Sequence, residues 1–208
     1  MTKELATVLS QESIAAGIYS LVLKVSFAGE IVPGQFVSLY SKDASRLLPR
    51  PISICDFSAE QGTIRLVYRI AGAGTLEFSK LRSGNTIDIL GPLGNGFPVD
   101  KYSESRVLLV GGGIGIPPLL SCARKLKNKA FAVGYRSDSY LLADLQSEAE
   151  VHIATEDGSL GICGNVIDAI RSDDVRADVI FSCGPKPMLR ALKAYAAEEG
   201  ISCYVSME

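Results

Sequence analysis

The chain lacks the residues on which many enzymes depend. Tryptophan is absent, and histidine occurs once, at His152. A single histidine has no second imidazole with which to share a metal ion, and one beside a strand is more often structural than catalytic. No paired carboxylates and no Ser/His/Asp set stand out along the chain. We therefore assign no side chain as a general acid or base.

Cysteines are few and widely separated, and no C-x-x-C pair is present. The five are Cys55, Cys122, Cys163, Cys183 and Cys203. Metal sites that can be recognised from sequence usually carry such pairs, so no metal site is predicted from this spacing. An odd number of cysteines also argues against a framework of disulfides, and most of these thiols are expected to be buried and free.

Charge of one sign and long apolar runs are both missing. The 208 residues include 21 basic and 23 acidic side chains, a formal net charge of −2, without a basic run. Nucleic acid is therefore not an expected partner. Apolar stretches are interrupted by Gly, Pro or charge before the roughly 20 residues that a membrane span needs, so no membrane partner is expected either. Residues 1–10 have no apolar signal core, and the expected location is cytoplasmic.

The residues that are present divide the chain into two halves with different patterns. Up to about Pro98, short apolar segments alternate with turn signals such as Pro33-Gly34 and Ser83-Gly84. Strands are expected at 19–25, 36–40, 52–55, 64–70 and 86–90, with one helix at 74–81. Several short strands without a long helix favour a small antiparallel β barrel.

After Pro98 the pattern changes to strands that alternate with helices. Strands are expected at 106–110, 130–135, 151–155, 179–183 and 203–206, and helices at 117–127, 165–171 and 187–199. This alternation implies right-handed crossovers and an α/β domain with a parallel sheet. The length suits two domains of about 100 residues each, and we place them at residues 1–98 and 99–208.

Two motifs of the first half suit a phosphorylated ligand. Arg50-Pro51-Ile52-Ser53 opens an expected strand, and the fixed φ of proline holds a guanidinium where it can pair with a pyrophosphate. Tyr68-Arg69 is followed by Gly72-Ala73-Gly74-Thr75 and a helix, whose free N–H groups and dipole attract phosphate. Each motif alone also fits a structural role, as a surface turn or as a turn with Thr75 as N-cap.

Two motifs of the second half lie where open parallel sheets bind ligands, beyond the carboxyl ends of strands. Gly111-Gly112-Gly113-Ile114-Gly115 forms the first strand-to-helix turn, although two prolines replace the third glycine of the G-x-G-x-x-G pattern. Cys183-Gly184-Pro185 ends the expected strand 179–183, and an exposed Gly184 backbone should face the same crevice. Asp157 lies on that edge too. The structural alternatives are a tight turn without a ligand and a buried cysteine before a helix.

The order of these four motifs resembles the ferredoxin–NADP reductase superfamily over essentially the whole chain. The resemblance implies an N-terminal antiparallel flavin-binding barrel followed by a nucleotide-binding domain with a parallel sheet. It implies that FAD is held by Arg50, Pro51, Ile52, Ser53, Val67, Tyr68, Arg69, Gly74 and Thr75. It further implies that NAD(H) is held by Gly112, Gly113, Gly115, Asp157, Cys183, Gly184 and Pro185, with Cys183 near the nicotinamide.

A closer resemblance is to the electron-transfer subunits of class B dihydroorotate dehydrogenases, carried by segments such as LLPRPISICDF, YRIAGAGT, GGGIGIPPLL, CGPKPMLRALK and CYVSME. It implies hydride transfer from nicotinamide C4 to flavin N5, and onward transfer to an FMN-type catalytic subunit of pyrimidine biosynthesis in a heterotetramer of two subunit pairs. In that family a Cys-rich stretch that binds a [2Fe-2S] cluster follows, whereas this sequence ends at Glu208. We therefore expect a cluster only on a longer C-terminus.

Three questions stay open at this level. The same flavin chemistry would serve a related NAD(P)H subunit of a bifurcating ferredoxin:NADP reductase or of a sulfide dehydrogenase. An adaptor that has lost flavin is less favoured, because Arg50, Ser53, Gly74 and Thr75 are all present together. After the expected strand 130–135, Asp138 suits the ribose diol of NADH whereas Arg136 suits the 2′-phosphate of NADPH. We expect NADH.

Overall fold

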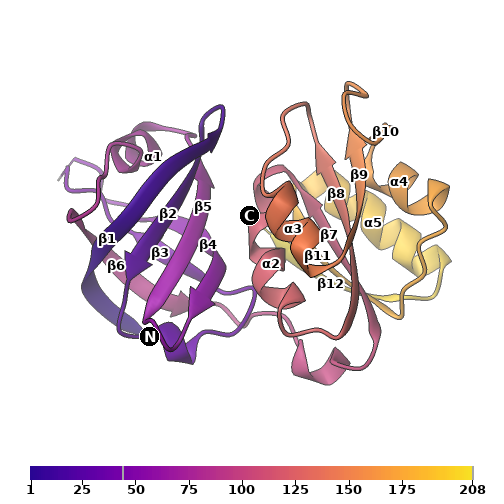
Figure 1. Ribbon diagram of the computed structural model, residues 1–208, viewed down its shortest axis with the longest axis horizontal. Helices are drawn as coiled ribbons and strands as arrows, with labels where there is room; N and C mark the ends of the chain where they lie inside the picture. The colour runs from indigo at the N-terminus through magenta and orange to yellow at the C-terminus, as the bar shows by residue number, and fades with distance from the viewer. Residues whose placement is uncertain (44, 208) are drawn as a thin grey trace. The chain divides into compact units, whose positions relative to one another are not determined.

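Alternating apolar and polar residues build the first part of the chain into an antiparallel barrel. Within the described residues the barrel has the strand order β1-β2-β5-β4-β3-β6 (Figure 1). The strands are β1 (Thr2–Ala15), β2 (Ile18–Lys24), β3 (Phe36–Leu39), β4 (Arg50–Ser58), β5 (Thr63–Arg69) and β6 (Thr86–Leu93). Alternate side chains such as Leu21, Leu23 and Leu66 point inward and are fully buried. The helix α1 (Ala73–Phe78) packs Phe78 into this core.

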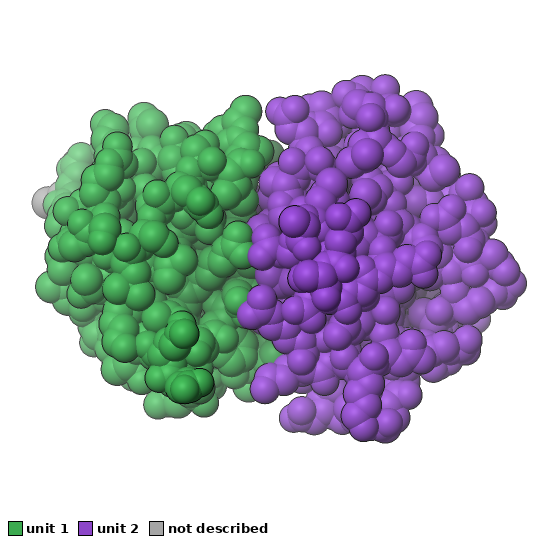
Figure 2. All heavy atoms as spheres, in the orientation of Figure 1, with its two compact units in different colours: residues 1–96 green, residues 97–208 purple. Residues whose placement is uncertain are grey.

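The computed structural model describes residues 1–43 and 45–207. The chain divides into two compact units, Met1–Gly96 and Phe97–Glu208, which Figure 2 distinguishes by colour. The boundary predicted from the sequence, between residues 98 and 99, lies two residues further along the chain. No helix in the described ranges is both long and apolar enough to cross a membrane.

The second unit is built on a parallel sheet. Among its described residues the strand order is β10-β9-β8-β7-β11-β12 (Figure 1). These strands are β7 (Arg106–Gly112), β8 (Asn128–Tyr135), β9 (Glu150–Thr155), β10 (Ile162–Cys163), β11 (Val179–Gly184) and β12 (Ser202–Met207). The predicted fold class, an antiparallel barrel followed by an α/β unit with a parallel sheet, is confirmed.

Helices cover both faces of this sheet. The helices α2 (Pro117–Ala123) and α3 (Leu142–Glu148) pack on one face, and α4 (Val166–Ser172) and α5 (Lys186–Glu198) pack on the other (Figure 1). Val166, Ile170 and Leu192 meet Leu108 and Val110 of β7 in a buried cluster. Short 3₁₀ turns occupy Ala28–Glu30, Asp100–Tyr102 and Gly113–Gly115.

Several elements differ from the sequence-based expectations. The strand β1 was not predicted, because bulges after Val8 and Ser13 interrupt its alternation and few of its side chains, such as Ala6, are buried. The helix α3 was also missed, since it starts after Leu141 with φ 61° and has no side-chain cap. The helix α2 ends at Ala123 rather than at 127, and it is buried all round rather than on one face.

Helix α4 carries a capping box that can be tested. Asn165 Oδ1 accepts hydrogen bonds from Ile167 N at 2.9 Å and from Asp168 N at 3.4 Å, and Asp168 Oδ2 accepts from Asn165 N at 2.8 Å. We expect Asn165→Ala to lower the free energy of unfolding by about 1 kcal/mol, because the first turn loses these acceptors. Thermal unfolding measures this change, with Asn128→Ala at the exposed first residue of β8 as the control. Equal unfolding temperatures for the two variants would contradict the expectation.

Candidate functional site

The closed barrel has an incomplete ladder between β4 and β5, and the end of that ladder leaves an opening in the hydrogen bonding of its wall. The residues Arg50–Ser53 pair with β3, and Val67–Arg69 pair with β2, but the ladder between β4 and β5 ends at Ile54 opposite Leu66. Beyond that pair the two segments have no ladder between them. Strand backbone groups need partners, so this opening can accept the polar atoms of a ligand.

Arg50 lies directly against Gly74 at this opening. A Cβ placed on Gly74 would be 2.7 Å from Arg50 Nε and 3.0 Å from its Cζ. A side chain at position 74 would therefore displace the guanidinium from this position. Arg50 Nη1 also donates to the carbonyl of Leu48. The structure thus brings together the R-P-x-S and G-x-G-T motifs, which lie far apart in the sequence.

The structural alternative for this motif, with Thr75 as N-cap, is wrong. The N-cap of α1 is Gly72, and Thr75 is the third helical residue. Its Oγ1 accepts from Ala71 N at 2.9 Å and from Gly72 N at 3.2 Å, and donates to Gly72 O at 3.1 Å. The N–H groups of Ala71 and Gly72 therefore bind Thr75 and are not free for phosphate. The side chain of Thr75 fixes the turn that holds Gly74 under Arg50.

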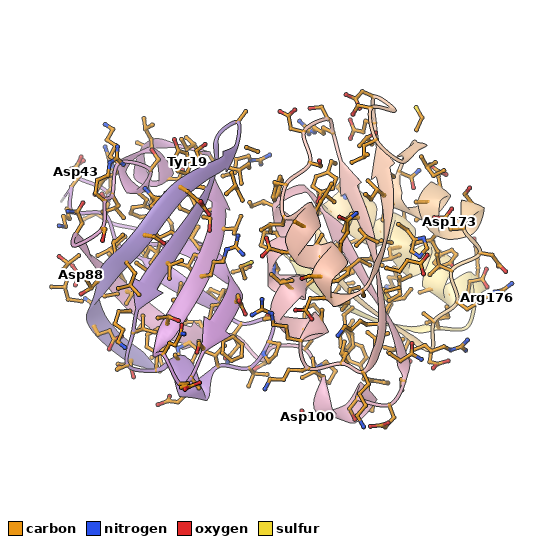
Figure 3. All side chains as sticks on the ribbon, in the orientation of Figure 1. Tyr19, Asp43, Asp88, Asp100, Asp173 and Arg176 are labelled. Atoms are coloured by element: carbon orange, nitrogen blue, oxygen red, sulfur yellow. The ribbon has the colours of Figure 1, made fainter. Side chains whose placement is uncertain are left out.

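Tyr68 contributes its side chain to the barrel core. Its ring is 1% exposed and stacks on Tyr19, labelled in Figure 3, with centroids 5.9 Å apart. Its hydroxyl donates to Gln11 Oε1 at 2.9 Å, and burial together with Tyr19 raises the pKa of Tyr68 far above its ordinary value. A ligand at the opening therefore meets the backbone of Tyr68 and not its ring. Val67 is buried and Arg69 is exposed.

The second group of predicted residues lies at the point where strand order reverses. The strands β8, β9 and β10 follow on one side of β7, whereas β11 and β12 lie on the other side. The carboxyl ends of β7 and β11 are neighbours, with Gly111 paired to Cys183. Open α/β sheets bind ligands at such a switch point. The glycine turn and the Cys183-Gly184-Pro185 segment are thus brought together as predicted.

Backbone lies against backbone where these two segments meet. A Cβ on Gly115 would be 2.3 Å from Cys183 O and 2.5 Å from Gly184 N. A Cβ on Gly112 would meet Met188 Sδ at 2.5 Å and Pro185 Cδ at 3.2 Å. Gly113 is different, since it has φ 52° and open space where its Cβ would be. The turn is therefore tight on its inner side and accessible at Gly113.

Cys183 and Gly184 are more enclosed than the sequence predicted. Cys183 is 1% exposed, and Gly184 is buried, so the expectation of an exposed Gly184 is wrong. The strand β11 pairs on both sides, with β7 and β12, and Met188 of α5 covers Gly184. Burial, together with the neighbouring thiol of Cys183, raises the pKa of Cys122 on α2.

Asp157 shares the edge of the sheet but is not in contact with the glycine turn. It follows β9, two strands from β7, which corresponds to about 10 Å across the sheet. Its Oδ1 accepts from Ser159 Oγ at 2.6 Å and from Ser159 N at 3.0 Å, and these hydrogen bonds lower the pKa of Asp157. It remains an exposed anion on the ligand-binding edge.

Sequence reasoning missed two residues that shape these sites. Met188 covers the inner side of Gly112, and Glu77 on α1 binds the loop that leads to Arg50. A helical methionine or glutamate gives no signal of such a role, because the contacts connect segments far apart in the sequence. The lone His152 lies beside the end of α4, with its Nδ1 2.6 Å from Oδ2 of Asp173, which Figure 3 labels.

No iron–sulfur or other metal site fits the part of the chain that the structure describes. It contains no group of three or more His, Cys, Asp or Glu side chains arranged to hold a metal ion. Cys55, Cys122 and Cys183 are buried in separate elements, and Cys163 is exposed. We therefore derive no step through a cluster held by residues 1–208.

The close approach at Gly115 gives a direct test of the switch-point geometry. We expect Gly115→Ala to destabilise the fold by about 2 kcal/mol or more, because the new methyl group would overlap the backbone of Cys183. Gly134→Ala in neighbouring β8 is the matched control, since its Cβ would lie 3.7 Å from Val166 Cβ. Chemical denaturation measures both variants. A Gly115→Ala protein as stable as the control would show that the turn is looser than described.

Comparison with known proteins agrees with this geometry. The model of the oxidoreductase FAD-binding domain family matches residues 5–97. The dihydroorotate dehydrogenase B (NAD(+)) electron transfer subunit of Listeria monocytogenes serotype 4a (strain HCC23) is 42% identical over 208 residues, which cover 97% of this chain and 81% of that protein. The subunit of the same name from Geobacillus kaustophilus (strain HTA426) is 42% identical over 199 residues, covering 91% and 77%.

Among solved structures, the NADH-dependent reduced ferredoxin-NADP oxidoreductase that was studied for flavin-based electron bifurcation superposes with a TM-score of 0.88. Its sequence identity is 30%, and the match covers 99% of this chain and 76% of that one. The resemblance inferred from the four motifs is thereby confirmed. The chain belongs to the family of electron transfer subunits of dihydroorotate dehydrogenase B, which are NAD(H)-linked flavin oxidoreductase subunits with the fold of the ferredoxin–NADP reductases.

Proposed function

We propose that this chain holds FAD at the opening between β4 and β5 and passes electrons between NAD(H) and an FMN-type catalytic dihydroorotate dehydrogenase subunit. The observation that carries the proposal is the guanidinium of Arg50, which lies against Gly74 beside the end of the ladder between β4 and β5. A planar, permanently charged donor at a gap in a sheet suits a pyrophosphate. When bound, FAD supplies the chemistry of accepting a hydride and releasing single electrons.

The first domain, residues 1–98, supplies binding and orientation for FAD. In this proposal Arg50 pairs with the pyrophosphate, and Ser53, with Pro51 and Ile52 beside it, lies along the isoalloxazine. The backbone of Val67, Tyr68 and Arg69 and the turn at Gly74 and Thr75 hold the remainder. Support comes from the end of the β4–β5 ladder at Ile54 and Leu66. Beyond that pair, the segments at Arg50–Ser53 and Val67–Arg69 have no ladder between them.

The second domain, residues 99–208, binds NAD(H) at the switch point between β7 and β11. Gly112, Gly113 and Gly115 let the dinucleotide approach the backbone, and Cys183, Gly184 and Pro185 flank the nicotinamide. Asp157 contributes from the same edge. Because Cys183 is buried, its role in this proposal is to set the shape of the site.

The electrons leave towards a catalytic subunit, and we propose a cytoplasmic heterotetramer of two subunit pairs in pyrimidine biosynthesis. The names of the relatives, which are electron transfer subunits, support such a partner. A second candidate function is that of a subunit of an NADH-dependent ferredoxin-NADP oxidoreductase, which the 0.88 TM-score with that protein favours. Co-purification with the neighbouring subunit distinguishes the two, because only the first requires a partner that oxidises dihydroorotate.

Arg50 provides the test of the flavin site. We expect Arg50→Ala to raise the Kd for FAD at least about tenfold, because charge-assisted hydrogen bonds to phosphate are lost. The Kd of Arg50→Lys should lie between those of the wild type and Arg50→Ala, because an ammonium keeps the charge but cannot bind phosphate in the bidentate manner. Quenching of flavin fluorescence measures the Kd, and Arg82→Ala, on an exposed turn of the same unit, is the control. An unchanged Kd for Arg50→Ala would refute this assignment.

The dinucleotide preference gives a second test. We expect NADH to reduce the bound flavin faster than NADPH, by about tenfold, in anaerobic stopped-flow measurements. The carboxylates of Asp138 and Asp157 stand on the ligand edge of the sheet, and the lowered pKa of Asp157 keeps it ionised at neutral pH, so a 2′-phosphate would be repelled. Faster reduction by NADPH would point instead to Arg136 as a phosphate ligand.

A further inference from the structure

The loop between β3 and β4 leads directly into Arg50 and is not held by apolar packing. Its leucines point outward, with Leu47 85% and Leu48 76% exposed. Many of its hydrogen bonds are internal, such as those from Ser45 N and Ser45 Oγ to Asp43 Oδ1 at 2.9 and 2.7 Å. Nothing in these contacts fixes the loop relative to the barrel. Its position must therefore come from polar contacts with another element.

Glu77 of α1 provides those contacts. Its carboxylate accepts hydrogen bonds from Ser41 Oγ, from Lys42 N at 2.8 Å and from Arg46 Nη1. Arg46 also donates to the carbonyl of Ala73 at 3.1 Å, in the first turn of the same helix. Between residues 41 and 49, leaving aside position 44, the side-chain hydrogen bonds to other elements end on α1, apart from the bond that Leu48 O accepts from Arg50.

The charges around Glu77 favour its ionised form. Partial desolvation raises its pKa, but the hydrogen bonds from Ser41 and Lys42 and the positive charge of Arg46 outweigh that effect and hold the pKa below its ordinary value. Asp43 opposes them, and it forms an ion pair with Arg46 Nη2 at 3.3 Å. Figure 3 labels Asp43 at the outer side of the barrel. Lys42 and Lys80 line the same recess.

The contacts of Glu77 connect the two segments that we assign to FAD. On one side lies the loop that ends in Arg50, whose Nη1 donates to Leu48 O within that loop. On the other lies α1, which follows the Gly72–Thr75 turn and contains Gly74. Fixing loop and helix to each other keeps the guanidinium over Gly74 before any ligand arrives.

We propose that Glu77 is a positioning residue for flavin binding, acting through Arg46 and the loop 41–49 to hold Arg50 in its binding geometry. The inference rests on the proposed FAD site. A preformed site binds more tightly because the ligand does not have to order the loop. Without Glu77 the loop is released, and each binding event has to restore its order.

A double-mutant cycle on Glu77 and Arg46 tests this inference. We expect Glu77→Ala and Arg46→Ala each to raise the Kd for FAD about tenfold, and the double variant to be no weaker than either single one, because both remove the same connection. Glu77→Gln should recover part of the affinity, since its amide oxygen still accepts from Lys42 N. In the flavin-free protein, amide exchange of residues 41–49 should speed up in Glu77→Ala.

The control is the exposed ion pair between Arg171 and Glu198, with Nη2 and Oε2 2.9 Å apart. Arg171→Ala and Glu198→Ala should leave the Kd for FAD within about twofold of wild type. If Glu77→Ala fails to fold, Ser41→Ala and Glu77→Gln take its place, since each removes part of the connection. Both should raise the Kd for FAD, by less than Glu77→Ala would. Wild-type affinity in Glu77→Ala and Arg46→Ala, or strictly additive effects, would overturn the inference. A wild-type chain that binds no FAD would instead refute the proposed function.

Discussion

The approach of the Arg50 guanidinium to Gly74 is the contact on which the first unit's site depends. It combines a glycine at position 74, a turn that holds that glycine in place, and a loop that leads to the arginine. Thr75 stabilises the turn by accepting from the two amides before the helix. Glu77 ties the loop to the same helix. One short helix therefore organises a cationic site that neither motif forms alone.

The candidate site of the second unit is built from backbone groups, whereas that of the first unit is built around a charged side chain. Gly115 lies against the carbonyl of Cys183, and Gly112 lies under Met188, so the ends of β7 and β11 meet without side chains between them. Parallel strands on either side keep both ends at one edge of the sheet. A surface of this kind offers N–H and C=O groups at close range and carries no net charge. The open space beside Gly113 is the accessible part of this surface.

The parts of this architecture that follow from local pattern were predictable, and the parts that follow from long-range contact were not. Regular alternation and strand–helix order predicted the barrel and the parallel sheet. The strand β1 was not predicted because its bulges break the period-2 alternation, and α3 was not predicted because it lacks a side-chain cap. The pattern left open the alternative with Thr75 as N-cap, since an N-cap and a third helical residue both place a hydroxyl near the amides at the start of a helix. The burial of Gly184 depends on Met188 of the next helix, which no local pattern encodes.

The buried cysteines show how little side-chain chemistry the described residues offer. Cys122 is fully buried with its pKa raised, and its Sγ donates to Pro118 O at 3.5 Å. Cys183 of β11 is also buried and lies near Cys122. A thiol in such surroundings is a small apolar group and a poor nucleophile. Conversion of Cys183 to a bulkier residue would disturb the packing of β11 against α2. Redox chemistry therefore belongs to the bound cofactors, and the protein's residues serve to hold and orient them.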